Sequence, residues 1–219
     1  MAESEAGVSI YLLLGSEAAL ADRTLKKLLD QLREDNTEVT TIFSGDAVVG
    51  DIADALAPSL FSEKRALVIR DLQDLPNEVQ DEVTRYLDDV DPTMTVIFIH
   101  KGGVKGKALL DRIKKAKAEI ILCDALKKES EKQEFVRNLF LDLGRKATPA
   151  AVAALVGAVG GDLRELSGAC GQIASDTKGV IDEVMIDKYH QGRIETTGFD
   201  VADATLDGNV SQALLALRS

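Results

Sequence analysis

The chain has 219 residues, of which 45% are hydrophobic and 29% charged, a composition typical of a globular protein of one or two domains. Its formal net charge of −11 argues against binding DNA over the whole surface, because phosphate contacts require an excess of Lys and Arg. No apolar run approaches the length of a membrane span, and the first residues carry acids where a secretory signal has bases, so we expect a cytoplasmic protein.

Short apolar segments alternate with amphipathic segments through the first 125 residues. The expected strands cover residues 9–14, 38–44, 65–71, 94–100 and 118–124, and leucines at helical spacing predict a helix through 25–32. Further helices are expected over 48–57, 77–89 and 105–117. Alternating strands and helices, with strands apolar on both faces, predict a parallel sheet covered on both sides. The most apolar strand, MTVIFIH (94–100), is expected at its centre, and residues 1–125 are expected to form an α/β domain.

The pattern becomes helical after residue 125. Helices are expected over 128–144, from Thr148-Pro149 onward, over 161–175 and over 181–190, which makes residues 126–195 a small helical domain. Residues 196–219 are expected to be the start of a third helical domain that is cut short. The two cysteines, Cys123 and Cys170, fit no metal or redox spacing and are expected to be reduced and buried.

An α/β domain followed by a small helical lid is the order found in AAA+ ATPases, but the residues that hold ATP are missing. The phosphate loop of such enzymes, G-x-x-x-x-G-K-[ST], is replaced by LLLGSEAALADR, in which only Gly15 remains and Glu17 brings a carboxylate to the helix N-terminus. The third strand ends in Asp71 beside an Arg, where a pair of acids is required. We therefore expect an ATPase-like fold with no intrinsic ATPase activity and no bound cofactor or metal.

An alternative is an α/β-fold enzyme with an unrecognised site near His100 and Asp71. His100 ends the expected central strand, which is where α/β folds place catalytic residues. It has no identifiable partner in the sequence, and a lone His is more often structural. An assay for nucleotide binding separates the two hypotheses.

Two large apolar residues, Leu60 and Phe61, stand in what reads as a turn between the helix expected over 48–57 and the strand expected over 65–71. The stretch that contains them is APSLFSEKRALVIRDL (57–72). Pro58 ends the preceding helix, and polar residues follow the pair. One interpretation is that the turn presents both side chains to a partner as interface anchors. The other is that they cap the domain's own core, as apolar residues usually do.

Positive charge concentrates in the helix expected over 105–117. The residues in question are Lys101, Lys105, Lys107, Arg112, Lys114, Lys115 and Lys117. They could face DNA or an acidic partner, or they could form a solvated face. No aromatic residues interleave to stack bases, so we favour the solvated face.

Several of these segments, in this order and spacing, resemble the delta subunit of the bacterial DNA polymerase III clamp loader. The similar segments are YLLLGSEAAL, SLFSEKRALVIRDL, GGDLRELSGACGQIA and FDVADATLDGNVSQALLAL. The related delta-prime subunit would be expected to carry zinc-ligand cysteines and a Ser-Arg-Cys motif, and this chain has neither.

The resemblance implies a mechanical role without ATP hydrolysis, within a DNA polymerase (nucleotidyltransferase) holoenzyme. It implies that Leu60 and Phe61, with Ser59, bind the sliding clamp (the beta subunit) and that the chain helps to hold the clamp open for loading on DNA. It also implies assembly with the tau/gamma and delta-prime subunits, with residues 196–219 starting the collar domain. The net charge of −11 indicates that any contact with DNA is indirect or weak.

Overall fold

The computed structural model describes residues 9–58, 62 and 64–192. The chain divides into two compact units, Met1–Ala125 and Leu126–Ser219. No helix among the described residues is long and apolar enough to cross a membrane.

The first unit is built on a five-stranded sheet whose strands all run parallel. Its strands are β1 (Ile10–Leu14), β2 (Glu38–Phe43), β3 (Arg65–Arg70), β4 (Met94–His100) and β5 (Glu119–Leu122). Their order across the sheet is β2-β3-β4-β1-β5. The prediction of a parallel sheet with residues 94–100 at its centre is therefore confirmed.

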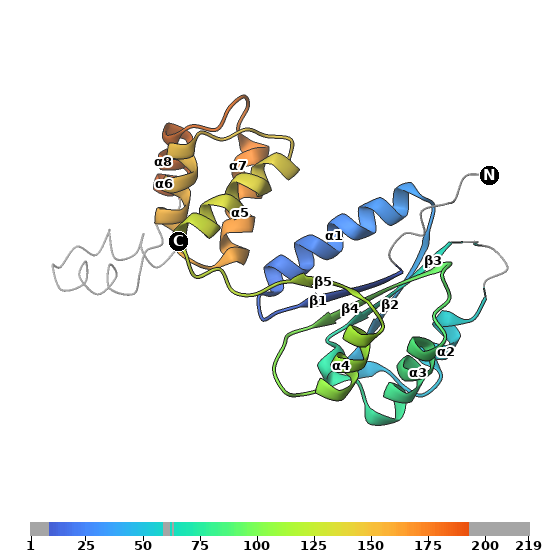
Figure 1. Cartoon of the computed structure of the whole chain (residues 1–219). Helices are drawn as coiled ribbons and strands as arrows, with labels where there is room; N and C mark the ends of the chain where they lie inside the picture. Colours follow the sequence, from blue (N-terminus) through green and yellow to red (C-terminus); the bar gives the residue numbers. More distant parts are fainter. Residues whose placement is uncertain (1–8, 59–61, 63, 193–219) are drawn as a thin grey trace, which may run out of the picture. The chain divides into compact units, whose positions relative to one another are not determined.

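Helices cover both faces of this sheet (Figure 1). Helix α1 (Ala18–Glu34) packs on one face, where Ala21 and Leu25 join Leu13, Val68 and Ile97 in one core cluster. On the other face lie α2 (Asp51–Leu56), α3 (Asn77–Asp88) and α4 (Lys107–Lys115), which contribute to a larger cluster. Two short 3-10 turns, η1 (Ser44–Asp46) and η2 (Leu72–Asp74), follow β2 and β3.

The two outer strands correct the expectation that every strand is apolar on both faces. In β2 and β5 most side chains are exposed or half-buried, including Phe43 at 56% and Leu122 at 66%. Both strands have a neighbour on one side only, so helices cover them less completely than β3, β4 and β1. Helix α2 is also shorter than the predicted 48–57, because Gly50 precedes it in the left-handed conformation with φ +104°.

The second unit contains helices α5 (Glu129–Asp142), α6 (Pro149–Val159), α7 (Leu163–Asp176) and α8 (Glu183–Gly192). Thr148 caps α6 by accepting a hydrogen bond from the Ala151 N–H at 3.1 Å, with Pro149 in the first turn as the sequence predicts. Both cysteines are free and buried, and burial raises the pKa of the Cys170 thiol to about 12. These thiols have the environment of structural rather than reactive cysteines.

Candidate functional site

The backbone after β1 occupies the position of the phosphate loop in an ATPase of this fold, and its N–H groups are already bonded. The Gly15 N–H donates to the carbonyl of His100 at 3.0 Å, and the Glu17 N–H donates to the carbonyl of Cys123 at 2.9 Å. A Cβ on Gly15 would lie 2.1 Å from the backbone of Cys123. The turn is therefore drawn onto the ends of β4 and β5, and these two N–H groups cannot cradle a phosphate without breaking bonds within the protein.

The N-terminus of α1 is closed by a carboxylate. Glu17 is the N-cap residue, and its side chain accepts a hydrogen bond from the Ala19 N–H at 3.2 Å, as expected from the sequence. This carboxylate complements the positive end of the helix dipole and would repel an incoming phosphate.

The end of β3 does not present a pair of acids. Arg70 forms an ion pair with Asp22 of α1 and stacks over the ring of Phe43, 5.9 Å from its centroid. Asp71 is bonded to Lys101, whose Nζ lies 2.7 Å from its Oδ1. The hydrogen bond from Lys101 holds the pKa of Asp71 below its ordinary value. The carboxylate of Asp71 is therefore already paired with a cation of the same chain.

Both ring nitrogens of His100 are engaged by backbone groups. The Gly102 N–H donates to Nδ1 at 2.8 Å, so Nε2 carries the proton and donates to the carbonyl of Lys105 at 3.0 Å. The residue is 1% exposed, and burial lowers its pKa. His100 therefore has no free nitrogen with which to act as a general base, and this geometry gives no support to an enzyme site built on His100 and Asp71.

Gln73 joins these groups into one network at the carboxyl edge of the sheet. Its amide nitrogen donates to Asp71 and Asp74, and its amide oxygen accepts from the backbone N–H of Lys101 at 3.1 Å. Lys105 bonds Asp74 through its Nζ at 2.6 Å. The network fixes the loop between β4 and α4 to the turn after β3, so these polar residues serve the fold here.

The predicted clamp-binding residues, Ser59, Leu60 and Phe61, lie outside the described residues. The structure does describe the chain on both sides of them. Ala57 and Pro58 are exposed, and the guanidinium of Arg65 bonds the carbonyls of Leu56, at 3.3 Å, and of Ala57. The two ends of this segment are therefore held together by one side chain.

The basic helix α4 buries Leu109, Leu110 and Ile113, as expected. Three of the cations predicted for this region are ion-paired with acids of neighbouring elements: Lys101 with Asp71 at 2.7 Å, and Lys105 with Asp74 and Arg112 with Asp88, each at 2.6 Å. The side chains of Lys107, Lys114 and Lys115 are exposed. The surface is less basic than the sequence alone suggests, because these carboxylates neutralise part of it.

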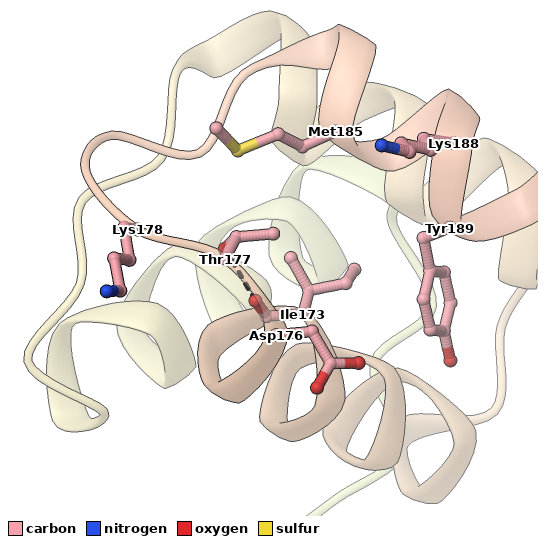
Figure 2. Close-up of a pocket in the computed structure, with 7 residues that line it drawn as sticks. All are labelled: Ile173, Asp176, Thr177, Lys178, Met185, Lys188 and Tyr189. Atoms are coloured by element: carbon pink, nitrogen blue, oxygen red, sulfur yellow. Dashed lines mark hydrogen bonds between the residues drawn. The ribbon is translucent and has the colours of Figure 1, made fainter.

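The sequence did not indicate a pocket in the second unit between the end of α7 and helix α8 (Figure 2). It has a volume of about 360 Å³ and is lined by Ile173, Asp176, Thr177, Lys178, Met185, Lys188 and Tyr189.

Arg164, near the start of α7, is exposed. Within the described ranges, no group of three or more His, Cys, Asp and Glu side chains is placed to hold a metal ion.

Comparison with solved structures identifies proteins that share the fold of this chain. The chain is similar to the DNA clamp loader delta protein of Bacillus subtilis, with a TM-score of 0.62, 15% identity, and coverage of 96% of this chain and 66% of that one. It is also similar to the RuvB Holliday junction branch migration motor of Thermotoga maritima, with a TM-score of 0.54, 15% identity, and coverage of 83% and 61%. At these identities the likeness shows the fold, which is AAA+-like.

A family model gives the more specific result. The model for DNA polymerase III, delta subunit, matches residues 11–130, which is more than half of the chain. The chain therefore belongs to the DNA polymerase III delta subunit family, as the sequence resemblance indicated. It spans about two thirds of the length of the Bacillus subtilis delta structure. A comparison with curated proteins gives no match.

Proposed function

We propose that this chain is a non-catalytic subunit of the bacterial replicative clamp loader, which binds the sliding clamp and helps to hold it open for loading on DNA. Membership of the delta family supports this role, as does the likeness to a protein described as a clamp loader delta protein. Its place of action would be the cytoplasm, where bacterial DNA is replicated.

The observation that carries the proposal is that N–H groups in the turn after β1 already donate hydrogen bonds within the protein. The N–H groups of Gly15 and Glu17 are bonded to carbonyls at the ends of β4 and β5, and Glu17 closes the first helix. A subunit built in this way would contribute to an ATP-driven assembly by binding the sliding clamp, while other subunits bind the nucleotide. The partners would be the sliding clamp and the tau/gamma and delta-prime subunits.

The contact with the clamp would be made by Leu60 and Phe61, with Ser59 beside them. Placing a Leu and a Phe in an apolar pocket of a partner gains roughly 1.5–3 kcal/mol for each side chain. Two such anchors match the usual composition of an interface centre. The supporting observation is that Ala57 and Pro58, which directly precede these residues, are exposed.

The domain roles follow the same family pattern. Residues 1–125 would form the AAA+-like domain with the clamp-binding element, and residues 126–195 the helical lid. Residues 196–219, which lie outside the described residues, would begin the collar domain through which the loader subunits assemble.

Capture of the chain by a purified bacterial sliding clamp tests the proposal. We expect the wild-type chain to bind and the double variant Leu60→Ala, Phe61→Ala to lose binding with little change in melting temperature, because the side chains would be anchors rather than core. Phe43→Ala with Leu122→Ala is a matched control, since it removes a Phe and a Leu that are exposed on the outer strands. The control should bind like wild type.

Three results would contradict the proposal. A double variant that binds the clamp normally would remove Leu60 and Phe61 from the contact, and one that unfolds would make them core residues. Measurable ATP affinity would contradict the non-catalytic assignment.

Contact with DNA is proposed to be indirect or weak. Lys105, Lys107, Lys114 and Lys115 would provide any direct contact with DNA or an acidic partner, but Lys105 is already paired with Asp74. We expect the purified chain to show little DNA binding in a fluorescence anisotropy titration. Salt-dependent binding that disappears on reversing the charges of Lys114 and Lys115 would show instead that α4 is a DNA-binding surface.

A further inference from the structure

Helix α2 leads directly into the proposed clamp-binding segment, and it is too short to be stable alone. It has six residues, of which only Ile52 is fully buried. Isolated helices shorter than about 12 residues are marginal in water. Its position must therefore come from contacts made by other elements.

The N-terminus of α2 is held by a buried carboxylate from α3. Glu82 accepts hydrogen bonds from the Gly50 N–H at 2.7 Å and from the Ala53 N–H at 2.9 Å, one on each oxygen. The residue is 5% exposed. A carboxylate at this depth is stable only when its oxygens are bonded, so Glu82 and the first turn of α2 fix each other.

The C-terminus of α2 is held by Arg65, at the start of β3. Its guanidinium donates to the carbonyls of Leu56 and Ala57 and lies 3.9 Å from the carboxylate of Asp91. The side chain of Arg65 is 11% exposed. The two charges thus match the dipole of α2, with the carboxylate at its positive end and the guanidinium at its negative end.

Arg65 also joins the two ends of the segment 58–64. Ala57, whose carbonyl it bonds, comes directly before Pro58, and Arg65 itself comes directly after Lys64. The Lys64 carbonyl in turn accepts a hydrogen bond from the Glu38 N–H of β2 at 3.1 Å. Fixing both ends of a short segment removes conformations that it would otherwise lose on binding a partner.

We propose that Glu82 and Arg65 are positioning residues for clamp binding: they fix the two ends of α2, the helix that leads into Leu60 and Phe61. This inference rests on the proposed function, because it concerns the same contact. Neither residue contacts the clamp in this mechanism.

The mechanism has a kinetic signature. When only a fraction of molecules is competent to bind, the apparent affinity falls by that fraction. Loss of a positioning residue therefore lowers the association rate and leaves the dissociation rate unchanged. Loss of a contact residue acts mostly on dissociation.

The experiment measures both rates for the full chain on an immobilised bacterial sliding clamp. The variants are Glu82→Gln, which keeps the shape of the side chain, and Arg65→Lys, which keeps the charge but loses the forked geometry. Arg112→Lys is the matched control, because Arg112 pairs with Asp88 between α3 and α4 and does not touch α2. Hydrogen exchange of the α2 amides and thermal melts accompany the binding data.

We expect each variant to associate with the clamp roughly tenfold more slowly, a change that corresponds to the free-energy cost of ordering one or two side chains on binding. The dissociation rate should be unchanged, and hydrogen exchange of the α2 amides should be faster. The control should match wild type in all three measurements. If either variant fails to fold, the other still tests the inference.

Faster exchange in α2 with unchanged association would overturn the positioning role while leaving the proposed function intact. An effect confined to dissociation would overturn it as well, because it would make these residues contacts. A wild-type chain that does not bind the clamp would remove the proposed function and this inference with it.

Discussion

Single residues decide how the turn after the first strand is used. Gly15 and Glu17 stand where an ATPase of this fold has its phosphate loop, and the sequence shows the loss of the loop and the carboxylate at the helix N-terminus. It could not show that the two N–H groups are bonded to His100 and Cys123, because these residues are about 85 and 106 positions further along the chain and meet the turn only through the sheet order.

Substitution of Gly15 tests how tightly this turn is closed. Gly15→Ala places a Cβ 2.1 Å from the backbone of Cys123, so the turn must move away from β5. We expect a loss of several kcal/mol in the free energy of unfolding, as for other substitutions that force overpacking or backbone strain, measured by urea denaturation.

Gly157→Ala is the control for this substitution. Gly157 lies inside α6, and a Cβ there meets no atom within 4 Å. Replacing a helix-interior Gly by Ala should stabilise the chain by about 0.5–1 kcal/mol. Equal stabilities of the two variants would show that the turn after β1 is looser than the structure indicates.

At the scale of elements, strand and helix periodicity predicted the sheet and its centre, because buried strands read as continuous apolar runs. The ends of α2 show what such patterns miss. Arg65 stands in the segment SLFSEKRALVIRDL that the sequence singles out, but the sequence does not show its bonds to the carbonyls of Leu56 and Ala57 at the end of α2. Glu82 carries no signal at all, since it is separated by 32 and 29 residues from the N–H groups that it accepts from.

The loop between β4 and α4 provides a pH-dependent prediction. Burial lowers the pKa of His100, and the positive charge of Lys114 on α4 lowers it further. The hydrogen bond to the Lys105 carbonyl and the negative charge of Asp74 on η2 oppose this shift without reversing it. As the pH falls, the unfolded chain therefore takes up the proton before the folded chain does. Neutral His100 contributes fully to the free energy of unfolding above its pKa in the unfolded chain, about 6.5. This contribution is lost as the pH falls through the pKa in the folded chain.

Urea denaturation between pH 7.5 and 5 measures this dependence. Stability should fall toward pH 5 in the wild type and fall less in His100→Gln. His190→Gln is the control for the second histidine. Asp71 and Asp74, whose pKa values are lowered by hydrogen bonds from Lys101 and Lys105, titrate below this window. A slope that is the same in wild type and His100→Gln would contradict the assignment.

At the scale of the whole molecule, the two units have separate cores, and each buries one cysteine. Cys123 belongs to the cluster under α1, whereas Cys170 lies among the helices of the second unit, and neither is more than 1% exposed. Each thiol therefore reports the opening of its own unit, because a buried thiol reacts with a labelling reagent only when its surroundings open.

Arg145 allows the second unit to be opened selectively. Its guanidinium donates to the carbonyls of Ala174, Thr177 and Gly179 and to the hydroxyl of Thr177, which fixes the end of α7 and the chain beyond it. Hydrogen bonds to charged groups contribute about 1.5–3 kcal/mol each, so Arg145→Ala should raise the labelling rate of Cys170 by roughly 100-fold or more. The rate is measured in a Cys123→Ala background, with Cys170→Ala reporting on Cys123. An unchanged Cys123 rate would show that the units open independently, whereas an equal rise at both thiols would mean that they unfold as one cooperative body.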